Sequence, residues 1–192
     1  MSRSVRNWIL LFVVIGVTIA IDQLTKHAVI NALEVREAYE PIPALGAVFQ
    51  ITRSENTGAA FGFLPDSGVL FLVIAVLVVM AMLYYYPRIP YDATLTRIAI
   101  GLICGGALGN ALDRVQHGLV VDFIHYSIPG IISNVSNLAD HAIVFGVIVM
   151  FFDSWRRERA QKQAAKIEAA SDTSNIVESI DFEPPSRQEH KE

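Results

Sequence analysis

Apolar and polar residues are distributed along this chain in long blocks rather than at short intervals. Four blocks, residues 8–26, 68–86, 94–112 and 138–155, carry few charges and are rich in Leu, Ile, Val, Ala and Phe. A helix of about 20 residues crosses the hydrocarbon core of a bilayer, and each block reaches about that length. The pattern therefore predicts four transmembrane helices.

The first apolar block also has features of a secretory signal peptide, because the basic residues Arg3 and Arg6 precede it. However, no small-x-small cleavage site follows Ala20, and no cysteine follows that could be lipidated. We therefore expect this block to be retained as the first transmembrane helix.

The flanks of the four predicted helices differ in positive charge. With four spans, both termini lie on one side of the membrane. The flanks on that side hold nine Lys and Arg residues, namely Arg3, Arg6, Arg88, Arg97, Arg156, Arg157, Arg159, Lys162 and Lys166. The flanks on the other side hold four, namely Lys26, Arg36, Arg53 and Arg114. Because Lys and Arg accumulate in cytoplasmic flanks, we predict that both termini lie in the cytoplasm.

Two longer polar segments, residues 26–67 and 113–137, lie on the predicted outer side. Within them, residues 45–53 and 118–124 are rich in β-branched and aromatic side chains and are bounded by Gly, Asn and Pro. Such composition is typical of short strands. The predicted fold is therefore a mainly α membrane protein with four transmembrane helices and a small amount of outer β-structure.

Composition divides the chain further. Of its 192 residues, 53% are hydrophobic and 18% are charged, but 19 charged residues fall in residues 1–155 and 15 in residues 156–192. We predict a four-helix membrane domain over residues 1–155 and a charged cytoplasmic tail over residues 156–192. The tail begins as a helical extension and loses its periodicity at residues 171–175, so we expect it to be disordered.

Charge and cysteine content exclude little else. The net charge is −4 and no basic cluster faces a solvent domain, so nucleic-acid binding has no support. The single cysteine, Cys104, permits no disulfide within the chain and leaves the redox compartment undecided.

Ionisable residues are costly inside a membrane, and here they gather near the outer ends of the predicted helices. They are Asp22, Lys26, Asp113, Arg114 and Asp140, with Asp122 on the adjoining predicted strand. Residues three, four or seven positions apart lie on one face of a helix. This spacing applies to the pairs Asp22–Lys26 and Asn137–Asp140 and to the set Gly106, Asn110 and Asp113. A further set with GxxxG spacing, Gly101, Gly105 and Gly109, is typical of close helix packing. The sequence thus predicts one polar layer at the outer membrane face.

The chemistry open to this layer is limited. The GxSxG, HExxH, Walker and GxGxxG motifs are all missing from the sequence. Carboxylates remain, and two that lie close together share a proton, so one can activate a water while the other polarises a carbonyl. A metal site formed by Asp122, His125, Asp140 and His141 is allowed by composition, but its spacing matches no metal motif. We therefore predict neither a metal nor a cofactor.

Four motifs, spread over about residues 5–155, resemble those of the lipoprotein signal peptidases (signal peptidase II), which are bacterial membrane aspartyl proteases. They are residues 22–26 (DQLTK), 56–62 (NTGAAFG), 105–114 (GGALGNALDR) with 120–124 (VVDFI), and 137–143 (NLADHAI). The resemblance implies that Asp122 and Asp140 form the catalytic pair. It also implies that Asn56, Gly58, Asn110, Arg114 and Asn137 bind substrate or support the pair, and that Asp22, Lys26 and Asp113 are structural.

The same resemblance implies a substrate and a place. The substrates would be prolipoproteins, cut immediately before a diacylglyceryl-modified cysteine, and the partners would be membrane lipids and the inhibitor globomycin. The protein would lie in the bacterial inner membrane, with a β-sheet cradle and the active site at its periplasmic face. Two residues depart from the family pattern: Ser136 replaces a usual Phe, and His141 stands where Ser is common.

Two other classes of function compete with a protease. Intramembrane carboxylates also occur in proton-coupled transporters, but a proton relay needs polar groups that reach both faces, and the inner halves of these helices supply none. A non-catalytic assembly subunit would explain the glycine spacing, but not the presence of Asp122 and Asp140 in one layer.

Overall fold

The computed structural model describes residues 2–58, 67–128 and 130–181, with side chains described up to residue 168. Its helices are α1 (Arg3–Ala32), α2 (Gly68–Tyr85), α3 (Thr94–His117) and α4 (Leu138–Asp181), with short 3-10 helices η1 (Pro43–Leu45) and η3 (Tyr86–Arg88). Its strands are β1 (Ala38–Tyr39), β2 (Phe49–Asn56), β3 (Val120–Ile128) and β4 (Ile132–Ser136). The chain forms two compact units, Met1–Phe151 and Phe152–Glu192.

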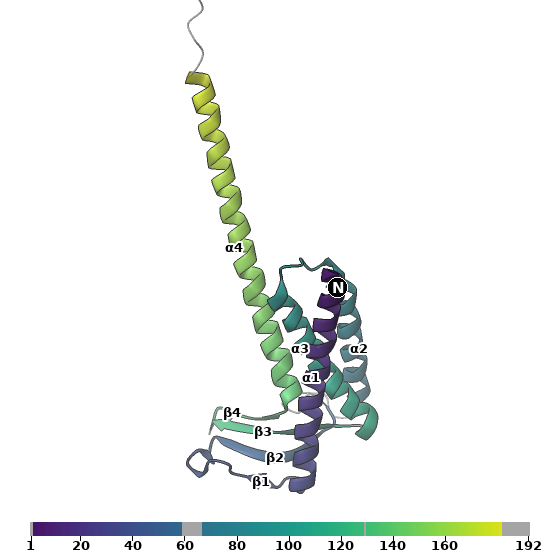
Figure 1. The fold of residues 1–192 in the computed structure, drawn as a ribbon. Coiled ribbons are helices and arrows are strands. Elements are labelled where there is room, and N and C mark those ends of the chain that lie inside the picture. Colours follow the sequence, from purple (N-terminus) through teal and green to yellow (C-terminus); the bar gives the residue numbers. More distant parts are fainter. Residues whose placement is uncertain (1, 59–66, 129, 182–192) are drawn as a thin grey trace, which may run out of the picture. The chain divides into compact units, whose positions relative to one another are not determined.

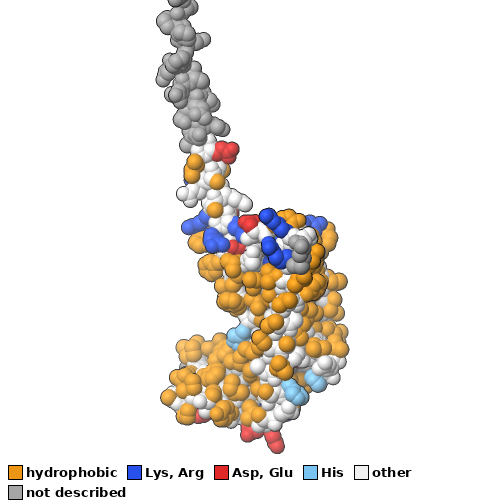
Figure 2. All heavy atoms as spheres, in the orientation of Figure 1, with side chains coloured by type: hydrophobic (Ala, Val, Ile, Leu, Met, Phe, Trp, Pro, Cys, Tyr) orange, Lys and Arg blue, Asp and Glu red, His pale blue; other side chains and the backbone are white. Residues whose placement is uncertain are grey.

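Among the described residues, four helices are long and apolar enough to cross a membrane, which confirms the predicted number of spans. Large apolar side chains on α1 and α2 point outward; Val69 and Leu77, for example, are 76% and 55% exposed. Hydrophobic side chains cover much of the visible surface around these helices (Figure 2). An exposed apolar surface of this extent is expected where lipid, rather than water, surrounds the helices.

Helix α3 packs against both α1 and α2. Of the most apolar 18-residue stretch of α3, 67% is buried inside the protein, against 6% of the corresponding stretch of α2. Three of its glycines, Gly101, Gly105 and Gly109, face α1 so closely that a Cβ atom would meet Val14, Thr18 or Asp22. The GxxxG spacing therefore packs α3 against α1, because small residues let two helix backbones approach.

A fourth glycine of α3, Gly106, sets the position of α4. A Cβ atom at Gly106 would meet the backbone of Ala139 and the side chain of Ile143, both in the first two turns of α4. Backbone cannot move aside as a flexible side chain can, so the first turn of α4 can approach α3 only where residue 106 is a glycine.

Replacing Gly106 by alanine is therefore expected to displace the start of α4, with a cost of about 1–3 kcal/mol in the free energy of unfolding. Thermal unfolding of the purified protein in detergent measures this loss. Gly16→Ala on α1 is the matched control, because nothing lies within 4 Å of a Cβ atom there. The control should unfold no earlier than the wild type. Equal stability of Gly106→Ala and Gly16→Ala would contradict this account of the packing.

The four strands form one antiparallel sheet in the order β1-β2-β3-β4, at the end of α1, α2 and α3 away from the N-terminus (Figure 1). Strand β2 pairs with β3 through Ser54–Asp122 and Asn56–Val120, with a shift of register between Ile51 and Ser54. These pairings bring the end of β2 beside the start of β3.

The strand predictions were correct in kind and inexact in extent. We predicted strands at residues 45–53 and 118–124, whereas β2 and β3 each begin later and run further. Gly118 has a φ of 74° and ends α3 in the left-handed conformation that glycine adopts readily, so β3 starts only after it. Strands β1 and β4 were not predicted, because β1 has two residues and β4 (ISNVS) is largely polar.

Helix α4 continues to Asp181, through residues 171–175, where we expected helical periodicity to end. Residues 158–170 are rich in Ala, Gln, Lys and Glu, which are strong helix formers, and no proline lies between residue 138 and Pro184. Residues 182–192 lie outside the described part of the chain. The predicted disorder and cytoplasmic location of the tail stay predictions.

Candidate active site

Three charged side chains are buried together where α1 and α3 approach the sheet. Lys26 Nζ lies 2.8 Å from Asp22 Oδ2 and 2.8 Å from Asp113 Oδ2. It also donates to Asn110 Oδ1 at 3.0 Å. Since a buried charge is tolerated when an opposite charge and hydrogen bonds accompany it, the lysine allows both carboxylates to lie inside the protein.

The same two carboxylates hold the chain next to the predicted catalytic residues. Asp22 Oδ1 accepts a hydrogen bond from the backbone N–H of Ala139 at 3.0 Å, directly before Asp140. Asp113 Oδ2 accepts from the backbone N–H of Val121 at 3.3 Å, directly before Asp122. These contacts support the structural role that we expect for the cluster of Asp22, Lys26 and Asp113.

Asp122 projects from β3 and is only 3% exposed. Asn56 Nδ2 donates to its Oδ2 at 2.8 Å, and Asn137 Nδ2 donates to its Oδ1 at 2.6 Å. Burial raises the pKa of Asp122 to about 6, and the nearby charge of Asp140 adds to this rise, although the two amide hydrogen bonds and Lys26 oppose it. Asp122 therefore takes up a proton far more readily than an ordinary aspartate does.

Asp140 lies in the first turn of α4 and forms a reciprocal cap with Asn137. The Asp140 backbone N–H donates to Asn137 Oδ1 at 3.0 Å, and the Asn137 backbone N–H donates to Asp140 Oδ2 at 3.4 Å. This is the arrangement of a capping box, with Asn and Asp in place of the more usual Ser and Glu. Asn110 Nδ2 donates to the other oxygen, Oδ1, at 2.7 Å.

Two asparagines connect the two aspartates. Asn137 Nδ2 donates both to Asp122 and, at 3.1 Å, to Asn110 Oδ1, while Asn110 in turn donates to Asp140. Both aspartates line one cavity of about 330 Å³, together with Asn56, Gly58 and Arg114 among others. The structure thus brings together all seven residues that we predicted for catalysis or for support of the catalytic pair.

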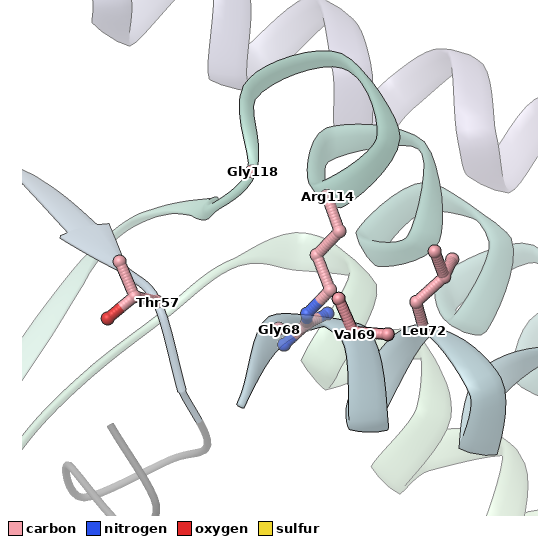
Figure 3. Close-up of a pocket in the computed structure, with 6 residues that line it drawn as sticks. All are labelled: Thr57, Gly68, Val69, Leu72, Arg114 and Gly118. Carbon is pink, nitrogen blue, oxygen red and sulfur yellow. The ribbon is translucent and has the colours of Figure 1, made fainter. Parts of the chain in front are cut away.

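Arg114 reaches across this region from α3. Its guanidinium donates to the backbone oxygen of Gly58 at 3.1 Å and to that of Asn110 at 3.2 Å, while its Nε is buried without a partner among the described residues. Figure 3 shows the side chain extending toward Gly68 and Val69 at the start of α2, beside a cavity of about 210 Å³. The next four residues of the second motif, 59–62, lie outside the described residues.

An apolar groove of about 300 Å³ continues from the polar cavity between α2, α3 and the start of α4. Its walls include Phe71, Ile74, Ala75, Val78, Ile103 and Ile143. Asn110, Arg114 and Asp140 line both the groove and the polar cavity. A ligand with an apolar part and a peptide part could therefore occupy both spaces and reach the aspartates.

Some polar contacts of the site were not predicted from the sequence. Gln23 Nε2 donates to Asp113 Oδ1 at 2.7 Å and so joins α1 to α3. Asn134 on β4 donates to the Tyr126 hydroxyl at 3.0 Å, and both residues line the polar cavity. Gln23 stands inside the first motif, which could have singled it out, whereas Asn134 carries no comparable signal.

The two departures from the family pattern have separate surroundings. Ser136 lines the polar cavity with a buried hydroxyl that lacks a partner among the described residues. His141 Nδ1 donates to the backbone oxygen of Asn137 at 2.7 Å, and its ring meets the ring of Tyr126 edge-on.

The ring nitrogens of His125, a residue of the metal site that composition would allow, contact Gln50 and Ser133. Within residues 2–58, 67–128 and 130–181, no three His, Cys, Asp or Glu side chains are grouped to hold a metal.

The fold is similar to that of solved bacterial membrane enzymes. One solved structure of such an enzyme, obtained by the in meso method at 2.3 Å resolution, superposes with a TM-score of 0.66 at 28% identity, covering 94% of each chain. A second, at 1.9 Å resolution, has a TM-score of 0.65 at 31% identity, covering 74% of this chain and 90% of its own.

Sequence comparison identifies the family. Residues 14–156 match the family described as signal peptidase (SPase) II. The lipoprotein signal peptidase of Halothermothrix orenii is 37% identical over 150 residues, which cover 78% of this chain and 98% of that protein. That of Bacillus subtilis is 37% identical over 147 residues, covering 74% and 94%. The chain belongs to the signal peptidase II family and is a membrane protease of lipoprotein processing, which confirms the resemblance seen in its motifs.

Proposed function

We propose that the chain is an aspartyl endopeptidase whose catalytic residues are Asp122 and Asp140. The observation that carries this proposal is that two aspartates from distant parts of the chain share one cavity and one set of amide donors. The amide donors hold the two carboxylates in fixed orientations. In these orientations the carboxylates can exchange protons with a substrate and a water.

In the proposed reaction the pair carries one proton and acts as a unit. One carboxylate takes a proton from a water while the water oxygen attacks the scissile carbonyl carbon. The protonated partner gives its proton to the carbonyl oxygen, so no full negative charge develops there. When the tetrahedral intermediate collapses, the protonated carboxyl gives its proton to the leaving amide nitrogen. The other carboxylate takes a proton from a hydroxyl of the intermediate, so the pair again holds one proton.

Asn56 tunes this pair through its hydrogen bond to Asp122. That hydrogen bond lowers the pKa of Asp122, so Asn56→Ala is expected to raise it above its value of about 6. The limb of the pH–rate profile that reports Asp122 should therefore move to higher pH, whichever role the carboxyl takes. Measuring kcat/KM between pH 4 and pH 9 tests this, with Glu55→Gln on the same strand as the control. A limb that stays in place, or that moves to lower pH, would contradict the assignment.

We propose that the substrates are prolipoproteins, cut immediately before a diacylglyceryl-modified cysteine. The apolar groove beside Asp140 supports this, because it offers acyl chains or an apolar signal segment a place next to the aspartates. The site lies at the sheet end of the helices, where a lipid-bearing cysteine at the membrane surface can reach it (Figure 1). The cyclic peptide globomycin would compete for the same polar cavity.

The uneven distribution of Lys and Arg supports a location in the inner membrane with the N-terminus in the cytoplasm. Lys and Arg side chains are visible at the end of the first unit away from the sheet (Figure 2). In this orientation the sheet, Asp122 and Asp140 face the periplasm.

The substrate proposal is tested with purified protein and two forms of one precursor, with and without the diacylglyceryl group. Burial of only four acyl CH₂ groups contributes about 3 kcal/mol, so the lipidated form should be cleaved about 100-fold more efficiently. The mass of the product should correspond to a chain that begins at the lipidated cysteine. Equal cleavage of both forms, or cleavage at another bond, would overturn the proposal.

A further inference from the structure

A second polar cavity lies at the opposite end of the helices from the sheet. It measures about 80 Å³ and is lined by Ser4, Asn7, Trp8, Tyr86, Tyr91 and Arg97. These residues come from the start of α1, from η3 and the segment after it, and from the first turns of α3. The cavity is separate from the catalytic one, and none of the residues that line it has a role in the proposed cleavage.

Arg97 is an unusual residue in this cavity, because it is a buried cation without a counter-ion among the described residues. It is 3% exposed, and its guanidinium donates to the backbone oxygens of Ile89 at 2.6 Å and Pro90 at 3.4 Å. The guanidinium also lies 4.8 Å from the centre of the Tyr86 ring. Within the described part of the chain Arg97 forms no ion pair, and its Nε has no hydrogen-bond partner. A buried charge in this state is costly unless an anion accompanies it.

A second buried donor without a partner among the described residues lies on Asn7. Asn7 is 8% exposed, and the donor is its Nδ2. Its backbone oxygen is already used by the Tyr86 hydroxyl at 2.6 Å. Two buried and unsatisfied N–H donors therefore line one small space, and such a space suits a ligand that only accepts hydrogen bonds.

The backbone adds to the positive potential. Arg97 lies at the N-terminal end of α3, a helix of 24 residues whose first turn contains no acidic residue. The N-cap residue, Ala93, supplies no side-chain acceptor to the free N–H groups of that turn. The partial positive charge of a helix N-terminus favours a nearby negative charge.

We propose that this cavity binds a phosphate oxyanion, held by Arg97 Nε and Asn7 Nδ2. Water could satisfy the two donors, but it could not balance the charge of the guanidinium. A cavity of about 80 Å³ holds one phosphate group and leaves its substituents outside. The cavity lies where α1 begins and where the second span ends at Arg88, which is the depth of lipid headgroups. The phosphate is therefore that of an anionic phospholipid or free phosphate.

Binding is tested on the full chain with two variants and one control. Asn7→Asp places a carboxylate beside Arg97, which supplies the missing charge from within and excludes an external anion. Arg97→Lys keeps the charge but removes the Nε donor. Arg88→Gln is the control, since it removes an exposed arginine at the same end of the helices, which donates to the backbone oxygen of Tyr84 and lies over the rings of Tyr84 and Tyr85.

Two probes distinguish the sources of phosphate. One is inorganic phosphate added to protein in lipid-free neutral detergent, and the other is phosphatidylglycerol added to nanodiscs of phosphatidylcholine. Thermal unfolding and native mass spectrometry report binding without any use of peptidase activity, so the result is independent of the cleavage proposal. Stabilisation of the wild type by both probes assigns a phosphate site, and stabilisation by the lipid alone assigns a headgroup site.

In either case Asn7→Asp should weaken binding about tenfold or more, as should Arg97→Lys, whereas Arg88→Gln should bind like the wild type. Asn7→Asp should also unfold no earlier than the unliganded wild type, because it pairs the buried guanidinium. A wild type that neither probe stabilises would overturn the proposal, and so would equal binding by the wild type and Asn7→Asp.

Discussion

Replacing either Asp122 or Asp140 by asparagine is expected to lower the rate of precursor cleavage by about 1,000-fold or more, while the protein still folds and inserts. The amide has nearly the shape of the carboxyl group, so most contacts of the cavity remain. It can neither take a proton from water nor give one to a carbonyl oxygen at neutral pH. In the proposed mechanism the two carboxyls share one proton, so loss of either one should stop the reaction, and the double variant should be little worse than a single one.

A carboxyl of the same sheet provides the control for these variants. Glu55 lies on β2 beside Asn56, is exposed, and pairs only with Arg53 among the described residues. Glu55→Gln removes one negative charge from the same sheet without touching the cavity, so its cleavage rate should stay close to that of the wild type. A comparable loss of activity in Glu55→Gln would mean that surface charge, rather than the chemistry of the pair, explains the effect.

The second large effect is expected at Lys26. Lys26→Met removes the only cation within 4 Å of Asp22 and Asp113 among the described residues, and leaves two buried carboxylates close to one another. Breaking a buried ion pair from one side costs about 3–5 kcal/mol. Since these carboxylates also bind the backbone N–H groups of Ala139 and Val121, the loss should spread to the neighbouring Asp140 and Asp122. Thermal unfolding in detergent measures it.

Two further variants separate the loss of the cluster from the loss of any lysine. Lys162→Met breaks an exposed pair with Glu158 and should change the unfolding temperature little. Adding Asp22→Asn and Asp113→Asn to Lys26→Met removes the unpaired charges and should restore part of the lost stability. If the single variant Lys26→Met unfolded at the wild-type temperature, the cluster would not have the structural role given to it here.

Much of this architecture could be predicted from the sequence because the signals are local. Apolar blocks of about 20 residues predict spans without knowledge of their neighbours. The Asn137–Asp140 spacing predicts that these two residues lie close together, and in the structure they form a capping box at the start of α4. The glycine spacing of α3 predicts close packing, and the structure identifies α1 as the partner of this face.

The features that escaped prediction depend on distant parts of the chain. Strand β4 is largely polar, and it is a strand because β3 supplies its hydrogen bonds. Asn56 and Asp122 meet only through the pairing of β2 with β3, which neither segment specifies alone. Arg97 was counted among the charges that flank the membrane, where a solvated side chain is the usual expectation. Only the packing of α1, η3 and α3 reveals that it is buried.

The central claim is that Asp122 and Asp140 together cut a lipidated precursor, and one assay tests it directly. A diacylated prolipoprotein is incubated with equal amounts of folded wild type, Asp122→Asn, Asp140→Asn and Glu55→Gln, and the products are weighed by mass spectrometry. We predict that the wild type and Glu55→Gln release a product beginning at the lipidated cysteine, whereas both aspartate variants leave the precursor intact. Cleavage by either aspartate variant at the wild-type rate, or no cleavage by the wild type, would contradict the account.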